Sequence, residues 1–159
     1  MRITLEHLSI SAISADRIEL LIERVDLPPG VDPVTTGFSH HQDALSHSTS
    51  WRAEPGSVIL TFAHVLPDQT ELTVPAADGA QDGDLSRWSG GPEELESLPS
   101  ACHAVRHLHF LRFTDQNIES YEGLDEFWAY AHSVADHHYP AVAGLLFTHG
   151  LAQGPDYVI

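Results

Sequence analysis

Histidine is the residue type of this chain whose numbers and spacing best suit chemistry. The chain has twelve histidines, seven arginines and no lysine among 159 residues, so imidazoles are the most abundant groups that can become cationic. An imidazole can bind a metal ion, transfer a proton or change its charge near neutral pH. Histidines concentrate at His40-His41, between His103 and His109, and between His132 and His138. This abundance favours a functional role without choosing among these three.

The strongest local signal is a β-hairpin over residues 45–66 with a Pro-Gly turn at 55–56. Proline presets φ at the second position of a turn, and glycine takes the positive φ that a type II turn needs at the third. With a two-residue loop, His47 lies opposite His64, and Trp51 lies on the same largely apolar face. A longer loop or a bulge would move His47 relative to His64.

This register predicts a ligand site on the face of the sheet. Directly opposed side chains of neighbouring strands are about 5 Å apart, which lets His47 and His64 act on one ligand. Apolar walls with a few polar groups are typical of small-molecule pockets, and Trp51 would supply such a wall. We therefore expect a small-molecule or metal-ion binding domain; in an enzyme, one of the two histidines would be the general base or a metal ligand. The alternative is that each imidazole hydrogen-bonds a backbone carbonyl near the core.

A second candidate is a zinc site at His103 and His107. Four residues apart on a helix expected at 100–114, the two rings share one face, as helical zinc ligands do. Zinc needs at least a third ligand, which His132 or Asp136 of the following helix would supply if the two helices pack antiparallel. The sequence between the two histidines lacks the glutamate of the His-Glu-x-x-His zinc proteases. The alternative is that both rings face solvent.

The elements that position these residues predict an α+β fold. A strand at 3–13 and the hairpin form an antiparallel sheet, which packs against about three helices. Apolar residues recurring at helical spacing indicate the helices; they are expected at 15–25, 100–114 and 124–138.

One domain is expected to span residues 1–159, with a mobile Gly-, Asp- and Ala-rich loop at about 76–92. Trp88 in this loop and Trp128 suggest an alternative function, in which the protein is a non-catalytic accessory protein or homodimer and both side chains line the interface.

Charge and cysteine content exclude several classes of function. The formal net charge is −16, and the few arginines are scattered, which argues against binding to nucleic acid or to an anionic membrane surface. The single cysteine, Cys102, forms no internal disulfide and fits a reducing compartment. The N-terminal residues do not read as a signal peptide, so we expect a cytoplasmic protein.

Overall fold

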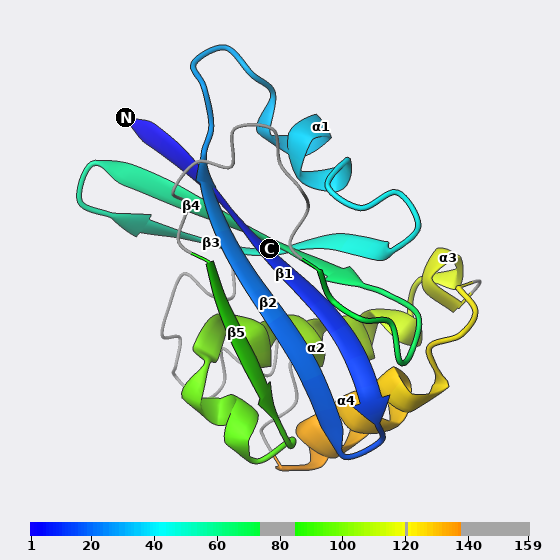
Figure 1. Cartoon of the computed structure of the whole chain (residues 1–159). Coiled ribbons are helices and arrows are strands. Elements are labelled where there is room, and N and C mark those ends of the chain that lie inside the picture. Colours follow the sequence, from blue (N-terminus) through cyan, green and yellow to red (C-terminus); the bar gives the residue numbers. More distant parts are fainter. Residues whose placement is uncertain (74–84, 120, 138–159) are drawn as a thin grey trace.

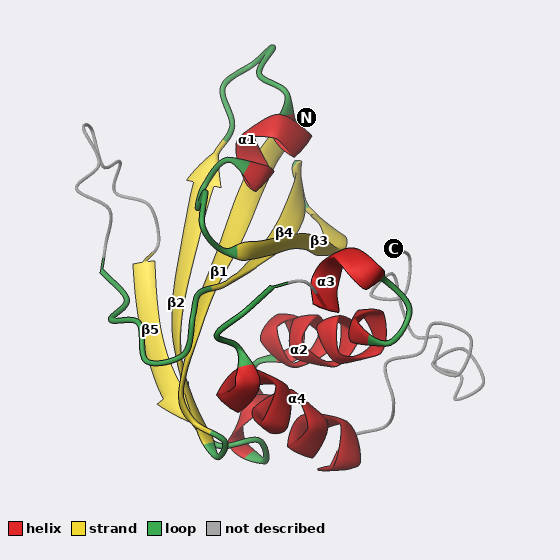
Figure 2. Ribbon diagram, turned by 90° about the vertical axis from the view of Figure 1, so that its right-hand side faces the viewer, coloured by secondary structure: helices red, strands yellow, loops and turns green. Residues whose placement is uncertain are grey.

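The computed structural model describes residues 1–73, 85–119 and 121–137, and shows a mixed sheet packed against helices (Figures 1 and 2). The five strands lie in the order β3-β4-β1-β2-β5. Only the central β1–β4 pair is parallel, and the other three pairs are antiparallel. The α+β fold is therefore confirmed, with a sheet that is mostly rather than wholly antiparallel.

Along the chain one short helix interrupts the run of strands, and the remaining helices follow the last strand. The elements are β1 (Arg2–Ser14), β2 (Arg17–Asp26), α1 (Pro33–Phe38), β3 (Leu45–Glu54), β4 (Ser57–Val65), β5 (Leu85–Gly90), the 3-10 helix η1 (Glu94–Ser97), α2 (Pro99–Arg112), α3 (Gln116–Glu119) and α4 (Asp125–His137). The expected hairpin and the two expected C-terminal helices are present. Among the described helices, none is both long enough and apolar enough to cross a bilayer.

The helix expected at 15–25 is wrong, because these residues form most of β2. Apolar residues in this stretch fit a helical spacing, but Ile18, Leu20 and Ile22 also alternate as in a strand. β2 pairs with β1 over its whole length and turns Ile18 and Leu20 into the core. Long-range pairing therefore decides between two patterns that the sequence satisfies equally.

The mobile loop expected at about 76–92 is wrong in its second half. Residues 85–90 form β5, which pairs antiparallel with β2 at the edge of the sheet. Residues 76–84 lie outside the described part of the chain.

The core lies between one face of the sheet and helices α2 and α4. Leu8, Ile10 and Ala12 of β1 enter this core, whereas His7 and Ser9 lie on the opposite face. In both views β3 and β4 lie between α1 on one side and α2 on the other (Figures 1 and 2). The α1 segment thus shields the polar residues that β1 and β4 carry on that side, while α2 and α4 cover the core on the other face.

Candidate functional site

Every histidine whose side chain the structure describes has another histidine ring beside it. Nine side chains form three groups with ring centroids of neighbours 3.8 to 5.9 Å apart. They are the four-histidine cluster (His7, His40, His41 and His64), the β3–α2 group (His47, His103 and His107) and the surface pair (His109 and His132).

A bulge in β3 separates the predicted pair of His47 and His64. Trp51 lies opposite Leu60, as predicted, but the register shifts between Ser48 and Ser50. Upstream of the bulge His47 therefore lies opposite Ala63, on the helix side of the sheet, while His64 lies on the α1 side. Trp51 shares the face of His64 but is 38% exposed. The prediction of a direct His47–His64 pair is wrong because one extra residue moves every preceding side chain to the other face.

His7 of β1 and His64 of β4 form the fixed half of the four-histidine cluster. The two strands are parallel neighbours, and both side chains lie on the α1 side of the sheet. The atoms His7 Nδ1 and His64 Nε2 are 2.9 Å apart, a hydrogen bond that holds one proton between two rings. The two residues are 3% and 0% exposed, so both rings are buried in the body of the fold.

The segment that follows α1 supplies the other half of the cluster. The imidazole of His40 stacks on that of His7 with a centroid distance of 3.8 Å, and His41 lies 5.4 Å from His64. α1 is held over the sheet by an edge-to-face contact between Phe38 and Phe62. These two histidines are half-buried and belong to no helix or strand.

Polar side chains hold the cluster from outside. Ser46 Oγ is 2.7 Å from His64 Nδ1, and Ser9 Oγ is 2.9 Å from His41 Nε2. The carboxylate of Glu23 accepts a hydrogen bond from His40 Nε2 at 3.3 Å. The outer nitrogens of His40, His41 and His64 therefore already have partners, as those of metal-binding histidines usually do.

Burial keeps three members of the cluster, His7, His41 and His64, uncharged at neutral pH. It lowers the pKa of His7 to about 3 and that of His64 to about 2, and repulsion from neighbouring histidines adds to the effect. The pKa of His41 is also lowered, by burial and by His40. These imidazoles thus carry a lone pair each at pH 7, which is the form that binds a metal ion.

The β3–α2 group contains the two histidines predicted as zinc ligands. His103 and His107 share a helix face as predicted, with parallel rings 5.9 Å apart, but they are buried against β3 instead of facing solvent. His103 Nε2 donates to the carbonyl of the bulge residue Thr49 at 3.1 Å. His107 Nε2 has no hydrogen-bond partner among the described residues. Burial, with repulsion from His47, lowers the pKa of His107 to about 4.

The predicted third ligands lie elsewhere. His132 belongs to the surface pair, where its Nδ1 is 3.4 Å from His109 Nε2. Its other nitrogen faces Asp136 at 3.4 Å, and both of these side chains are about two-thirds exposed. The structure thus brings His103 and His107 together with His47, and not with His132 or Asp136.

As they stand, the histidine groups form neither a closed metal site nor an activated nucleophile. Within the described ranges, no three His, Cys, Asp or Glu side chains converge as they stand on a point where they could hold a metal ion. Hydrogen bonds link Ser46 to His64 and His64 to His7, at distances found between a nucleophile, its base and an orienting group. A histidine with a pKa of about 2 is a poor base at neutral pH, however, and His64 has no exposed surface.

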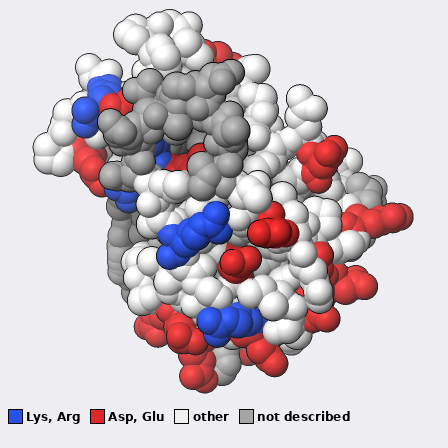
Figure 3. All heavy atoms as spheres, viewed as in Figure 1, with Lys and Arg blue, Asp and Glu red and all other residues white. Residues whose placement is uncertain are grey.

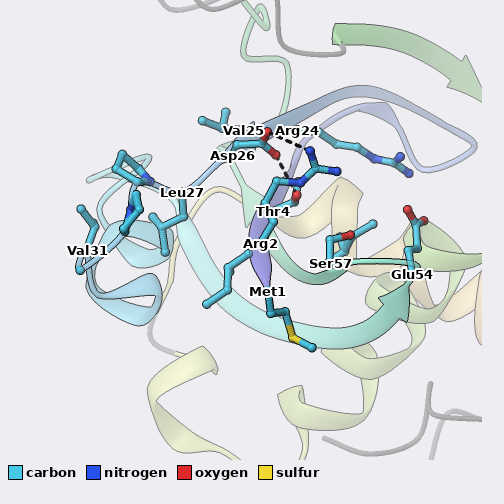
Figure 4. A pocket seen from close by; sticks show the side chains of 15 residues that line it. Met1, Arg2, Thr4, Arg24, Val25, Asp26, Leu27, Val31, Glu54 and Ser57 are labelled. Atoms are coloured by element: carbon cyan, nitrogen blue, oxygen red, sulfur yellow. Dashed lines mark hydrogen bonds and ion pairs between the residues drawn. The ribbon is translucent and has the colours of Figure 1, made fainter.

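Two clefts lie away from the histidines. The larger is an open depression of about 1290 Å³ around the end of the sheet, where Asp26 binds Thr4 and Arg2 (Figure 4). A smaller one of about 410 Å³ lies between the sheet and the start of α2. None of the described histidines lines either of them.

Sequence reasoning missed His7, His40 and His41 as members of one cluster. The only local signal was the alternation of His7 and Ser9 along β1.

Comparisons with protein-family models, with curated proteins and with solved structures find no match for this chain.

Proposed function

We propose that the protein binds a divalent late transition-metal ion, of which zinc is the representative, at the four-histidine cluster. The observation that carries the proposal is the approach of His7 Nδ1 to His64 Nε2 at 2.9 Å, with the rings of His40 and His41 within 5.4 Å of His64. Nitrogen ligands of imidazole type suit zinc, copper and nickel. The proposed site therefore differs from the ligand site that the sequence predicts between His47 and His64.

Charge and hydrogen bonding favour a cation here. The imidazoles of His7, His41 and His64 are neutral at pH 7, so they do not repel an incoming ion. The carboxylate of Glu23 accepts the Nε2–H of His40, which leaves Nδ1 as the nitrogen of that ring available to an ion. The chain as a whole is strongly acidic, which raises the local concentration of cations.

Binding requires a rearrangement that the fold permits. The proton shared by His7 and His64 must move to another ring nitrogen before both facing atoms can coordinate the ion. His40 is stacked parallel to His7, so its ring must turn, together with that of His41, to complete the ligand set. Both residues lie in a turn between α1 and β3, where a side chain can rotate without breaking a strand.

Metal-free protein without a purification tag tests the proposal by titration calorimetry with Zn²⁺. We expect one ion per chain, and at least tenfold weaker binding in the double variant His40→Gln/His41→Gln. The matched control is His109→Gln/His132→Gln, which removes the exposed surface pair and is expected to leave the affinity unchanged.

The alternative is that the cluster is only a set of hydrogen-bonded histidines that fill space under α1. Absence of stoichiometric binding in the wild-type protein would support that alternative and overturn the proposal. Binding that is lost in the control variant instead would move the site to the surface pair.

A further inference from the structure

The smaller cleft has mainly apolar walls and one charged end. It lies between the sheet and the first turn of α2, with a volume of about 410 Å³, within the range of small-molecule sites. The walls come from Leu8, Ile22, Leu85 and Leu98, while Glu6 and Arg24 line the charged end. An occupant of this cleft therefore meets apolar surface along most of its length.

A buried carboxylate organises the charged end. Glu6 is 2% exposed and accepts hydrogen bonds from two arginines. Arg52 donates to both of its oxygens, at 3.1 and 2.9 Å, and Arg24 Nε donates to one of them at 2.8 Å. Arg52 also lies 3.9 Å from the carboxylate of Glu54, so the two guanidinium groups are matched by two carboxylates. Arg24 is the one cation among the described residues that line the cleft.

Arg24 has binding capacity that the fold does not use. Its Nε is occupied by Glu6, and its terminal nitrogens have no hydrogen bond within the described part of the chain. The side chain is 38% exposed, and the residue lines the cleft. The two terminal nitrogens of a guanidinium form the fork that binds a carboxylate with two parallel hydrogen bonds.

The surroundings make this free fork distinctive. On the face shown in Figure 3, arginines are scattered among Asp and Glu side chains and form no continuous basic surface. The terminal nitrogens of Arg24 beside apolar walls suit a small anion with an apolar body. The hydroxyl-bearing Ser100, in the first turn of α2, adds a polar group that Arg52 already holds in place at 3.2 Å.

We propose that this cleft binds a small organic carboxylate, with the carboxylate on the terminal nitrogens of Arg24 and the apolar body between the sheet and α2. The site is separate from the four-histidine cluster and requires no metal ion. The two terminal nitrogens of Arg24 select the carboxylate, and the four leucine and isoleucine side chains of the lining select the apolar body.

Titration of the ¹⁵N-labelled protein with hexanoate, followed by amide NMR shifts, tests this inference. We expect saturable shifts at the cleft residues of β2, β5 and α2, and at least tenfold weaker binding in Arg24→Gln. Glu6 keeps its bonds to Arg52 in that variant, so the fold is expected to persist. The matched control is Arg87→Gln on β5, which makes the same charge change on the opposite face of the sheet.

Several outcomes of the titrations with wild-type protein and the two arginine variants would overturn the inference. They are equal binding of neutral hexanamide, unchanged affinity in Arg24→Gln, loss of binding in Arg87→Gln, and saturable binding of inorganic phosphate in place of hexanoate. A second variant, Ser86→Phe, narrows the cleft without a change of charge and is expected to weaken hexanoate binding at least fivefold. Unchanged hexanoate affinity in Ser86→Phe would equally contradict the placement of the apolar body.

Discussion

Acidification from pH 7.5 to pH 5 is expected to destabilise the metal-free protein strongly. His7, His64 and His107 are buried, with pKa values lowered to about 3, 2 and 4. In the unfolded chain each imidazole titrates near 6.5. Above that pH both states are neutral and there is no penalty; as the pH falls below it, only the unfolded chain takes up protons.

The size of the loss follows from these values. At pH 5 the unfolded chain holds about one proton on each of the three imidazoles, while the folded protein holds almost none. Each histidine then costs about 2 kcal/mol of stability, and the three together cost about 6 kcal/mol. Since domains are typically stable by about 5–15 kcal/mol, this loss brings the protein close to unfolding.

Two other charge effects are separable from this one. The pKa values of Glu6 and Glu23 are lowered in the folded protein, so they add a loss of the same sign, but mainly below pH 4.5. Relief of repulsion among the many carboxylates acts in the opposite direction. The lowered pKa values of His41 and His109 add to the loss, so the measured loss at pH 5 is expected to stay at about 6 kcal/mol.

Urea unfolding with a chelator present, at pH 7.5 and pH 5, measures the loss directly. In His107→Gln the difference between the two pH values is expected to shrink by about 2 kcal/mol, whatever the variant does to absolute stability. The control His132→Gln removes an exposed imidazole and is expected to change the difference far less than His107→Gln does. A wild-type loss under 1 kcal/mol, or an unchanged difference in His107→Gln, would refute the reasoning.

Three further substitutions test how the sheet and its two faces are held, each by urea unfolding at pH 7.5. Gly37→Ala places a Cβ against the ring of Phe62, so α1 or that ring must move, at a cost of about 2 kcal/mol; a neutral result would show that α1 is loosely held. Glu6→Gln leaves two arginines without their carboxylate and is expected to cost about 3 kcal/mol, whereas a gain in stability would contradict the described network. Tyr130→Phe removes a buried hydrogen bond to the carbonyl of Gly90 and is expected to cost about 1 kcal/mol, and no change would mean that water replaces the bond.

Local patterns were sufficient to predict much of the fold. The first strand, the hairpin at 45–66 and the helices at 100–114 and 124–138 follow from periodicity and turn chemistry, which act within a few residues. Gly56 has the positive φ, 78°, that the predicted turn requires. The stretch 15–25 failed because its apolar residues fit two periods, and only pairing with β1 selects one.

The candidate site could be predicted only in part. His7 and His64 are 57 residues apart and meet because β1 and β4 pair in parallel, a long-range choice that no local pattern specifies. The bulge at Thr49 has no strong sequence signal, yet it places His47 and His64 on opposite faces. Abundant histidine marked the right residue type, but the topology and one bulge decide which of them meet.

The most direct test of the metal-binding proposal is a long-range ¹H–¹⁵N spectrum of the imidazoles during titration of metal-free protein with Zn²⁺. We expect His7 Nδ1 and His64 Nε2 to shift together into the range of metal-bound nitrogen at one equivalent, along with one nitrogen each from His40 and His41. The β3–α2 group and the surface pair should not change at that ratio. Shifts confined to those other histidines, or no shift in the four-histidine cluster, would contradict the account.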